Sequence, residues 1–345
     1  MSSPAFLPQL TEQEVRALAQ LPLEDLTPRA HAVSLEYHGT SVFLRGLIEA
    51  TNHCAQNCLY CGIRRNNAKV RRYRLSREEI LAIVERGFAF GFRTFVIQGG
   101  EDPCYTTEFL ASLCEEIKNR TAGKAAITLS FGTKSLAAYR DLARAGADRY
   151  LMRFETADPV LHEKLRDGNS LASRIKALDC IRESGLQVGS GFMVGLPGET
   201  EETLIQNIML AGRINMDMGG VGPFIPHPDT PLRCAVQKPI ELAIRATALL
   251  RLMLPHCHIP ATTAAGSLDP LGREKMLAAG ANVLMPNITT VEHKKDYQLY
   301  PGKICIDESG FQCVSCQAMR IASVGLSISW DRGDALRLKE RSHVW

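Results

Sequence analysis

The chain has 345 residues, of which 45% are hydrophobic, and it carries a formal net charge of +3. That length can bury a large core in two domains or in one barrel, and the small charge, without a Lys- or Arg-rich run, argues against a nucleic-acid partner. The opening MSSPAFLPQLTEQEV does not have the pattern of a signal peptide, and no apolar run is long enough to span a membrane. We therefore expect the eleven cysteines to bind metal in a reducing cytoplasm rather than to form disulfides.

The first part of the chain predicts short helices. Thr11 and Glu14 have the spacing of a capping box, which predicts a helix over residues 11–21. Pro22 and Pro28 bracket a second short turn or helix, and residues 29–37 predict a third. We expect residues 1–40 to form a helical extension, a lid or plug that precedes a main domain at 41–290.

A cysteine-rich stretch follows the first β-rich segment, residues 42–49. Cys54, Cys58 and Cys61 are spaced C-x3-C-x2-C. Thiolates are soft ligands that suit iron–sulfur clusters, and three of them on a [4Fe-4S] cluster leave one iron open to a small chelating molecule. A zinc site or a structural thiol cluster is the alternative, but zinc sites usually show paired C-x2-C knuckles or histidine partners, and no second knuckle lies nearby.

Strands and helices then alternate along the chain. The patterns predict strands at residues 42–49, 94–98, 125–131, 149–154, 187–194, 219–225, 259–264 and 282–285. Between them they predict helices at 77–90, 107–120, 135–145, 170–184, 200–215, 239–254 and 270–279. Eight parallel βα units favour a complete (β/α)8 TIM-type barrel, with a doubly wound open sheet as the alternative. Active sites of such barrels lie at the carboxyl ends of the strands.

Several residues at those strand ends could bind ligands. After the second strand, Gln98 is followed by Gly99, Gly100 and Glu101, and paired glycines let the backbone approach a ligand, although a plain turn would look the same. Arg153 and Glu155 project to one side of the fourth strand, where they would be costly unless they bind each other or a ligand. The hydroxyls of Thr262 and Thr263 could bind an anion, or they could reflect only the β-propensity of threonine.

Two further features complete the candidate site. Arg174, in a predicted helix, could hold a carboxylate through paired hydrogen bonds, although a helical arginine is usually a surface residue. The tail at residues 291–345 contains Cys305, Cys313 and Cys316, spaced C-x7-C-x2-C. They could hold a second cluster, a [2Fe-2S] or a [4Fe-4S]; zinc with His293 and a site without metal are the alternatives.

From about residue 45 to residue 316, the chain resembles the HydE family, the radical S-adenosylmethionine (SAM) maturases of [FeFe]-hydrogenase. The segments that carry the resemblance are CAQNCLYCG, QGGEDP, ADRYLMRFETADPVLHEKLR, GPFIPHPDTPL, IPATTA, NVLMPN and YQLYPGKIC. The resemblance implies a complete barrel whose three loop cysteines hold a SAM-ligated [4Fe-4S] cluster. It places SAM at Tyr60, Gly99, Gly100, Glu101, Ser130, Glu155 and Arg174, and an auxiliary cluster at the tail cysteines. We expect anionic groups of the substrate at Gln98, Thr128, Arg153, Thr262, Thr263 and Tyr297.

The implied activity is reductive cleavage of SAM to a 5′-deoxyadenosyl radical. The implied substrate is a small organometallic Fe–CO–CN species that bears cysteine, on the way to the diiron subcluster of the hydrogenase. We expect a monomer that receives electrons from a ferredoxin or flavodoxin and works with partner maturases. The alternatives are a methylornithine synthase-like or biotin synthase-like enzyme acting on a small organic substrate, and an iron–sulfur scaffold without SAM chemistry. Two positions depart from the family pattern, which often has Ser at Gly99 and His at Phe154.

Overall fold

The computed structural model describes residues 10–339. The ends of the predicted extension and tail, residues 1–9 and 340–345, therefore lie outside the described residues. Among those that are described, no helix is both long and apolar enough to cross a membrane.

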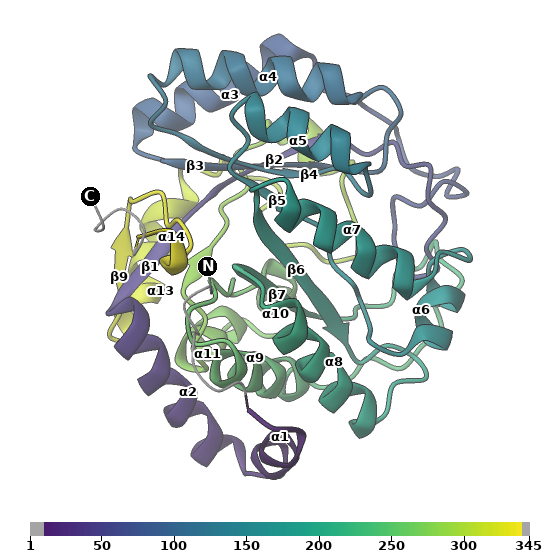
Figure 1. The fold of residues 1–345 in the computed structure, drawn as a ribbon, viewed down its shortest axis with the longest axis vertical. Helices are drawn as coiled ribbons and strands as arrows, with labels where there is room; N and C mark the ends of the chain where they lie inside the picture. Colours follow the sequence, from purple (N-terminus) through teal and green to yellow (C-terminus); the bar gives the residue numbers. More distant parts are fainter. Residues whose placement is uncertain (1–9, 340–345) are drawn as a thin grey trace.

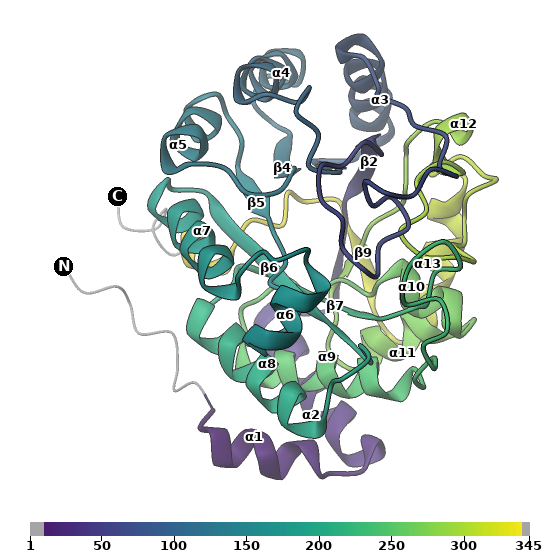
Figure 2. The same cartoon turned by 90° about the vertical axis from the view of Figure 1, so that its right-hand side faces the viewer.

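Six parallel strands form the main sheet, in the order in which they occur along the chain. They are β2 (Gly46–Thr51), β3 (Thr94–Gly99), β4 (Ala126–Ser130), β5 (Arg149–Leu151), β6 (Gln187–Val194) and β7 (Met218–Pro223). The connecting helices are α3 (Arg77–Phe90), α4 (Thr107–Arg120), α5 (Leu136–Arg144), α6 (Pro159–Leu165), α7 (Leu171–Glu183) and α8 (Glu201–Ile214), and α9 (Glu241–Met253) follows β7. The sheet is curled and the helices cover its outer face (Figures 1 and 2). The predicted architecture, in which parallel strands alternate with helices, is confirmed for these six strands.

The last strands are shorter than predicted. β1 (Ser41–Leu44) pairs with β8 (Val283–Leu284) and with β9 (Ser327–Ser329) in a second sheet, so the predicted strand at residues 42–49 divides at Arg45. Beyond β7, isolated parallel bridges join Met218 to His258, Pro260 to Val283 and Leu47 to Asn287. At Pro260, regular pairing is limited because a proline has no N–H to donate to a strand ladder. The prediction of a strand through residue 264 is wrong, since α10 (Thr263–Leu268) already begins there.

The two faces of the main sheet differ in polarity, because side chains alternate along a strand. Ile48, Phe95, Ile97 and Leu129 belong to the apolar core that the helices share with the sheet. Glu49 is the register partner of Gln98, which in turn pairs with Ser130, so these polar residues share the other face. We call the space that this inner face borders the lumen.

The amino-terminal helices extend the outer helical layer rather than forming a lid. They are α1 (Glu12–Ala19), which has the predicted capping box, and α2 (Leu23–His38). The prediction of two separate segments around Pro28 is wrong: α2 runs through this proline, and its buried face packs against α9. Packing against a neighbour can outweigh the one backbone hydrogen bond that a proline removes. Arg245 of α9 fixes the turn between the two helices by donating to the carbonyls of Ala19 and Leu21.

The tail packs against the rest of the fold, where β9 contacts β1 and α13 contacts α11. It contains α12 (Val291–Lys294), α13 (Cys313–Ser323), β9 and α14 (Leu336–Lys339), and it follows α11 (Gly272–Ala278). After β9, it crosses the amino ends of the strands. The Arg332 carbonyl accepts hydrogen bonds of 2.7 Å from Thr94 Oγ1 and from Arg149 Nη2, and Asp334 pairs with Arg149 at 2.7 Å. Thr94 and Arg149 are the first residues of β3 and β5, so this segment covers the end of the sheet opposite to the strand ends discussed below.

The Asp334 pair makes the stability of the protein depend on pH. Burial opposes ionisation of this carboxyl, but Arg149 and Arg332 outweigh burial and lower its pKa from 3.8 to about 2. Because the folded-state pKa lies below the unfolded one, the stabilisation is present above about pH 4 and is lost as pH falls to about 2, in total about 2 kcal/mol. We expect Asp334→Asn to flatten the unfolding free energy, measured with urea, over this pH window. The exposed Asp331→Asn is the control, and equal slopes in the two variants would contradict the prediction.

Candidate active site around the cysteine loop

Residues 52–74, between β2 and α3, form the segment that we call the cysteine loop. Three backbone hydrogen bonds fix it to three other parts of the molecule. Ala55 N–H donates to Glu101 O at 2.9 Å, Leu59 N–H to Leu165 O at 2.9 Å, and Gly62 N–H to Leu299 O at 3.0 Å. The loop is therefore held by the turn after β3, the end of α6 and the tail. Figure 2 shows the loop in dark purple in front of the strands, within the ring of helices.

The three loop thiols have surroundings that suit an iron–sulfur cluster. Cys58 is buried and Cys54 and Cys61 are half-buried, and burial raises the pKa of each thiol. Cluster binding would therefore release protons, since only thiolates act as ligands. Glu101 N–H donates to Cys54 Sγ at 3.3 Å, and hydrogen bonds to the sulfurs help to set the reduction potential of a cluster. Cys58 also contributes to a small apolar cluster with Tyr60, Leu161, Leu165, Met193, Leu196 and Phe224.

The glycine turn after β3 fits closely against the cysteine loop. A Cβ on Gly100 would lie 2.1 Å from His53 O, so only glycine fits there. A Cβ on Gly99 would lie 2.6 Å from Thr51 Cγ2 and 2.8 Å from Phe131 Cε1. This close packing accounts for the absence of a larger side chain at Gly99, where the resembling family often has Ser.

A cavity of about 130 Å³ lies beside the cysteine loop. Its lining contains two predicted residues, Glu101 and Arg174, together with Gln56, Thr133, His162, Arg166, Asn169, Ser170 and Ser173. Arg174 donates from Nε to Arg153 O at 3.0 Å and from Nη1 to Thr133 Oγ1 at 3.1 Å, and Nη1 lies 3.8 Å from Glu101 Oε1. Its buried guanidinium is thus positioned at the wall of the cavity, although α7 is an outer helix.

The sequence analysis missed Arg166 and its neighbours. Arg166 Nη1 donates to Tyr60 Oη at 3.2 Å and Nη2 to Glu101 Oε1 at 3.4 Å. Gln56 Nε2 donates to Glu101 Oε2 at 3.0 Å, and Gln56 Oε1 accepts from Asn169 Nδ2 at 2.9 Å. Arg166 and Asn169 follow α6, a helix that was not predicted. Asp158 followed by Pro159, an N-cap before a first-position proline, was the available signal.

Glu155 is buried in an unusual backbone conformation. Its φ is +67°, in the left-handed region that non-glycine residues rarely adopt and that is often found at functional sites. Arg153 Nη2 lies 3.1 Å from Glu155 Oε2, so the two side chains do meet, although β5 ends at Leu151 rather than at residue 154 as predicted. Glu155 Oε2 nevertheless accepts no hydrogen bond from any described residue. It is a buried acceptor that a ligand hydroxyl or amine could satisfy.

The structure places the predicted substrate residues in different surroundings. Thr128 Oγ1 is buried without a hydrogen-bond partner among residues 10–339. A Cβ on Gly222 would lie 3.9 Å from Arg153 Nη1 and 4.0 Å from Thr262 Oγ1, so these two side chains approach one space. Thr262 also caps α10, accepting from Ala265 N–H at 3.3 Å, a role that the strand prediction did not foresee. Gln98 and Ser130 are register partners on β3 and β4. Among the described residues, we find no hydrogen bond of the Thr263 hydroxyl.

The tail contributes a buried ion pair to the lumen. Lys303 Nζ pairs with Glu49 Oε1, donates to Tyr297 O at 3.2 Å and lies 5.3 Å from the centre of the Tyr297 ring. Asn287 Nδ2 donates to Glu49 Oε2 at 2.7 Å. Tyr297 was predicted as a substrate residue, whereas Glu49 and Lys303 were not singled out.

Two of the three tail cysteines lie together. Cys305 has a φ of +62°, and a hydrogen bond from Cys313 lowers its pKa to about 6. Arg273 Nη2 lies 4.0 Å from Cys305 Sγ, while Cys316 is exposed. His293, the candidate zinc ligand, stacks on Tyr73 with ring centres 4.4 Å apart. Within the described part of the chain, no three His, Cys, Asp or Glu side chains form a site for a single metal ion.

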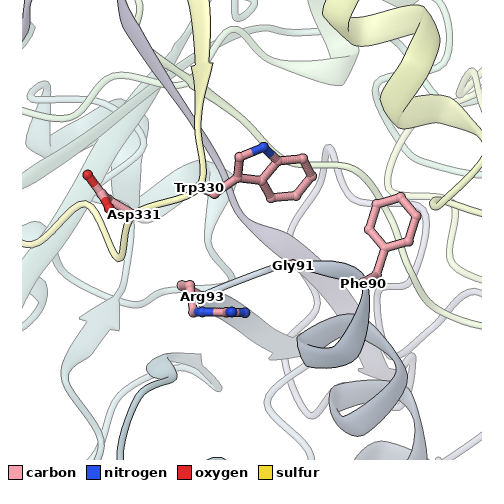
Figure 3. A pocket seen from close by; sticks show the side chains of 5 residues that line it. All are labelled: Phe90, Gly91, Arg93, Trp330 and Asp331. Atoms are coloured by element: carbon pink, nitrogen blue, oxygen red, sulfur yellow. The ribbon is translucent and has the colours of Figure 1, made fainter.

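A second hollow of about 610 Å³ lies elsewhere on the molecule, between the end of α3 and the segment after β9 (Figure 3). It is lined by Phe90, Gly91, Arg93, Trp330 and Asp331. It is larger than the cavity beside the cysteine loop, but none of the predicted site residues lines it. We therefore assign the candidate site to the smaller cavity and the lumen.

The chain is similar to several known proteins. The family model described as "Radical SAM superfamily" matches residues 48–211, a range that contains the loop cysteines, the glycine turn, Glu155 and Arg174. The [FeFe] hydrogenase maturase subunit HydE of Thermotoga maritima is 43% identical over 317 residues, which cover 92% of this chain and 90% of that protein. The 3-methylornithine synthase of Methanosarcina acetivorans is 31% identical over 298 residues, covering 84% of this chain and 83% of that protein.

Solved structures show the same fold. The crystal structure of methylornithine synthase (PylB) matches with a TM-score of 0.80 and 26% identity, covering 97% of each chain. The crystal structure of HydG, described as a maturase of the [FeFe]-hydrogenase, also has a TM-score of 0.80, covering 97% of this chain and 76% of that one. At 16% identity, the second match supports the fold alone.

Proposed function

Since the chain belongs to the radical SAM superfamily, and within it to the HydE family of [FeFe]-hydrogenase maturases, we propose that it cleaves SAM during assembly of the hydrogenase's diiron subcluster. One observation carries the proposal. Glu101 joins the two halves of the site, because its backbone N–H donates to Cys54 Sγ while its side chain lies between Arg166 and Arg174 at the cavity.

The residues present fit the two groups that this chemistry needs. Cys54, Cys58 and Cys61 would hold a [4Fe-4S] cluster, with Tyr60 packed against Cys58. The Gly99–Gly100 backbone, Glu101, Ser130, Glu155 and Arg174 would hold SAM. With both groups bound, the chemistry supplied is reductive cleavage of SAM to methionine and a 5′-deoxyadenosyl radical. The protein's part is to orient the cofactor: Arg174 would take its carboxylate, and Glu155 Oε2, which lies 3.1 Å from Arg153 Nη2, would accept from its amine or ribose.

We place the substrate, a small Fe–CO–CN species bearing cysteine, in the lumen. Gln98, Thr128, Arg153, Thr262, Thr263 and Tyr297 would bind its polar groups; the unpaired Thr128 hydroxyl and the approach of Arg153 to Thr262 support this. We also propose that the sheet closes as a complete barrel within residues 41–290, between the extension at 1–40 and the tail at 291–345. The isolated bridges at His258, Val283 and Asn287 support closure. A closed barrel would keep a radical away from water.

The remaining parts of the proposal concern the surroundings of the enzyme. We propose an auxiliary cluster at Cys305, Cys313 and Cys316, supported by the closeness of the first two thiols. We propose that the protein is a monomer. We also propose that it works in a reducing cytoplasm, since all eleven cysteines, which lie within the described residues, are free thiols. A ferredoxin or flavodoxin would supply electrons, and partner maturases would deliver or receive the organometallic species.

The substrate proposal can be tested by stimulation of SAM cleavage. Anaerobically reconstituted protein would be given dithionite and SAM, with a cysteine-bearing iron carbonyl cyanide complex or with free cysteine as the control. We expect the complex, and not cysteine alone, to increase 5′-deoxyadenosine formation and to be altered at its sulfur-bearing ligand. Cleavage that the complex leaves unchanged would contradict the substrate and favour a small organic one, as the likeness to methylornithine synthase would suggest.

A further inference from the structure

Arg166 is a buried cation that touches both halves of the site. It follows the last residue of α6, and 7% of its side chain is exposed. One amino group donates to Tyr60 Oη in the cysteine loop, and the other donates to Glu101 Oε1 in the glycine turn. The third donor, Nε, is buried without a partner within residues 10–339. A buried guanidinium with an unused donor is costly unless a ligand completes its shell.

The charges that line the cavity do not balance. Two of the lining side chains are guanidinium groups, Arg166 and Arg174, and one is a carboxylate, Glu101. His162 adds no positive charge, because burial and Arg166 lower its pKa to about 4. A buried cavity with one excess positive charge is complementary to one carboxylate. The amino acid end of SAM carries such a carboxylate.

The contacts of Arg166 also lead directly to the cluster ligands. Tyr60 lies between Cys58 and Cys61 in the chain and packs against Cys58. The Leu59 N–H donates to the carbonyl of Leu165, the residue before Arg166. On the other side, Asn169 Nδ2 donates to Arg166 O at 2.6 Å and to Gln56 of the cysteine loop. A change in the position of Arg166 would therefore move the loop that carries the thiols.

We propose that Arg166 is a positioning residue that binds the carboxylate end of SAM together with Arg174 and, through Tyr60, sets the environment of the [4Fe-4S] cluster. The inference rests on the proposed binding of SAM. It adds to that function a physical link between the occupied cofactor cavity and the cysteine loop. A nearby buried positive charge also favours the reduced, more negative cluster.

The test compares four variants of the reconstituted protein. Arg166→Met removes the charge, Arg166→Lys keeps the charge without the planar fork, and Tyr60→Phe removes the hydrogen bond. Lys164→Gln, an exposed cation on the same helix, is the control. SAM affinity is measured by equilibrium dialysis, and the midpoint potential and EPR spectrum of the cluster by redox titration.

We expect Arg166→Met to weaken SAM binding by about 10- to 100-fold, as for the loss of a hydrogen bond to a charged group, and to shift the midpoint potential to more negative values. Arg166→Lys should restore most of the potential but not the affinity. Tyr60→Phe should change the EPR spectrum, because it removes the hydrogen bond that joins Arg166 to the cysteine loop.

The outcomes separate this inference from the proposed function. Wild-type protein that holds a cluster but does not bind SAM would overturn the proposed function itself. If the wild-type protein binds SAM, and Arg166→Met has the same SAM affinity and midpoint potential as Lys164→Gln, the inference alone would be overturned. If the Arg166→Met variant binds no cluster, the test rests on Arg166→Lys and Tyr60→Phe. Wild-type SAM affinity in Arg166→Lys, together with an unchanged EPR spectrum in Tyr60→Phe, would then overturn the inference.

Discussion

Replacing Cys58 with alanine is expected to abolish 5′-deoxyadenosine formation and to lower bound iron by one cluster, about four irons per chain. Cys58 is the most buried of the three loop thiols, and it packs with Tyr60 against the apolar residues at the end of α6. Two thiolates cannot hold a cluster in place of three, and alanine leaves an apolar cavity that no other donor can fill. The effect is therefore a loss of the reaction, not a reduction in its rate.

The matched control is Cys104→Ala, which removes an exposed thiol close to the glycine turn. It should leave iron content and SAM cleavage unchanged, since Cys104 has no place in the site. Iron is measured after anaerobic reconstitution and 5′-deoxyadenosine by chromatography. Normal turnover in the Cys58→Ala variant would contradict the assignment of the cluster to this loop.

The second large effect concerns stability. Lys303→Met is expected to lower the unfolding free energy by about 3–5 kcal/mol, the usual cost of removing one partner of a buried ion pair. The side chains of Lys303 and Glu49 are 8% and 2% exposed, and Asn287 holds the other carboxylate oxygen. Methionine fills a similar volume but removes the ion-pair partner of the buried Glu49 carboxylate.

Two further variants isolate the charge from the packing. The double variant Glu49→Gln with Lys303→Met should recover most of the unfolding free energy that Lys303→Met loses, because neither charge of the ion pair remains. Lys295→Met is the control: its pair with Asp307 is exposed, at 57% and 71%, so we expect no measurable change in the unfolding free energy. Urea unfolding of the protein without added cluster measures all three. Equal midpoints for Lys303→Met and Lys295→Met would show that the pair does not stabilise the fold.

Much of the architecture could be predicted because local signals and packing agree. Ser76, Thr200 and Thr11 each begin a helix with the capping contacts that their spacing indicates. The apolar runs of β3, β4 and β6 lie where a parallel sheet buries them. Parallel strands align their carboxyl ends, so the cysteine loop, the glycine turn and Glu155 could be placed at one edge before the structure was known.

What could not be predicted depends on contacts between distant parts of the chain. Pro28 is a helix breaker by local rules, but packing against α9 keeps α2 continuous. The ion pair of Glu49 with Lys303 joins residues 254 apart, and no local pattern marks it. Arg166 is one arginine among many until the fold brings it to Tyr60 and Glu101. The segment around Asp334 likewise gains its role from the strand ends that it covers.

The most direct test of the central claim is the amount of 5′-deoxyadenosine produced by anaerobically reconstituted protein after reduction with dithionite in the presence of SAM. The account predicts cleavage of SAM in wild-type protein that carries the loop cluster, and none in Cys58→Ala. Protein that holds a full cluster on Cys54, Cys58 and Cys61 but produces no 5′-deoxyadenosine would contradict it, and would favour an iron–sulfur scaffold.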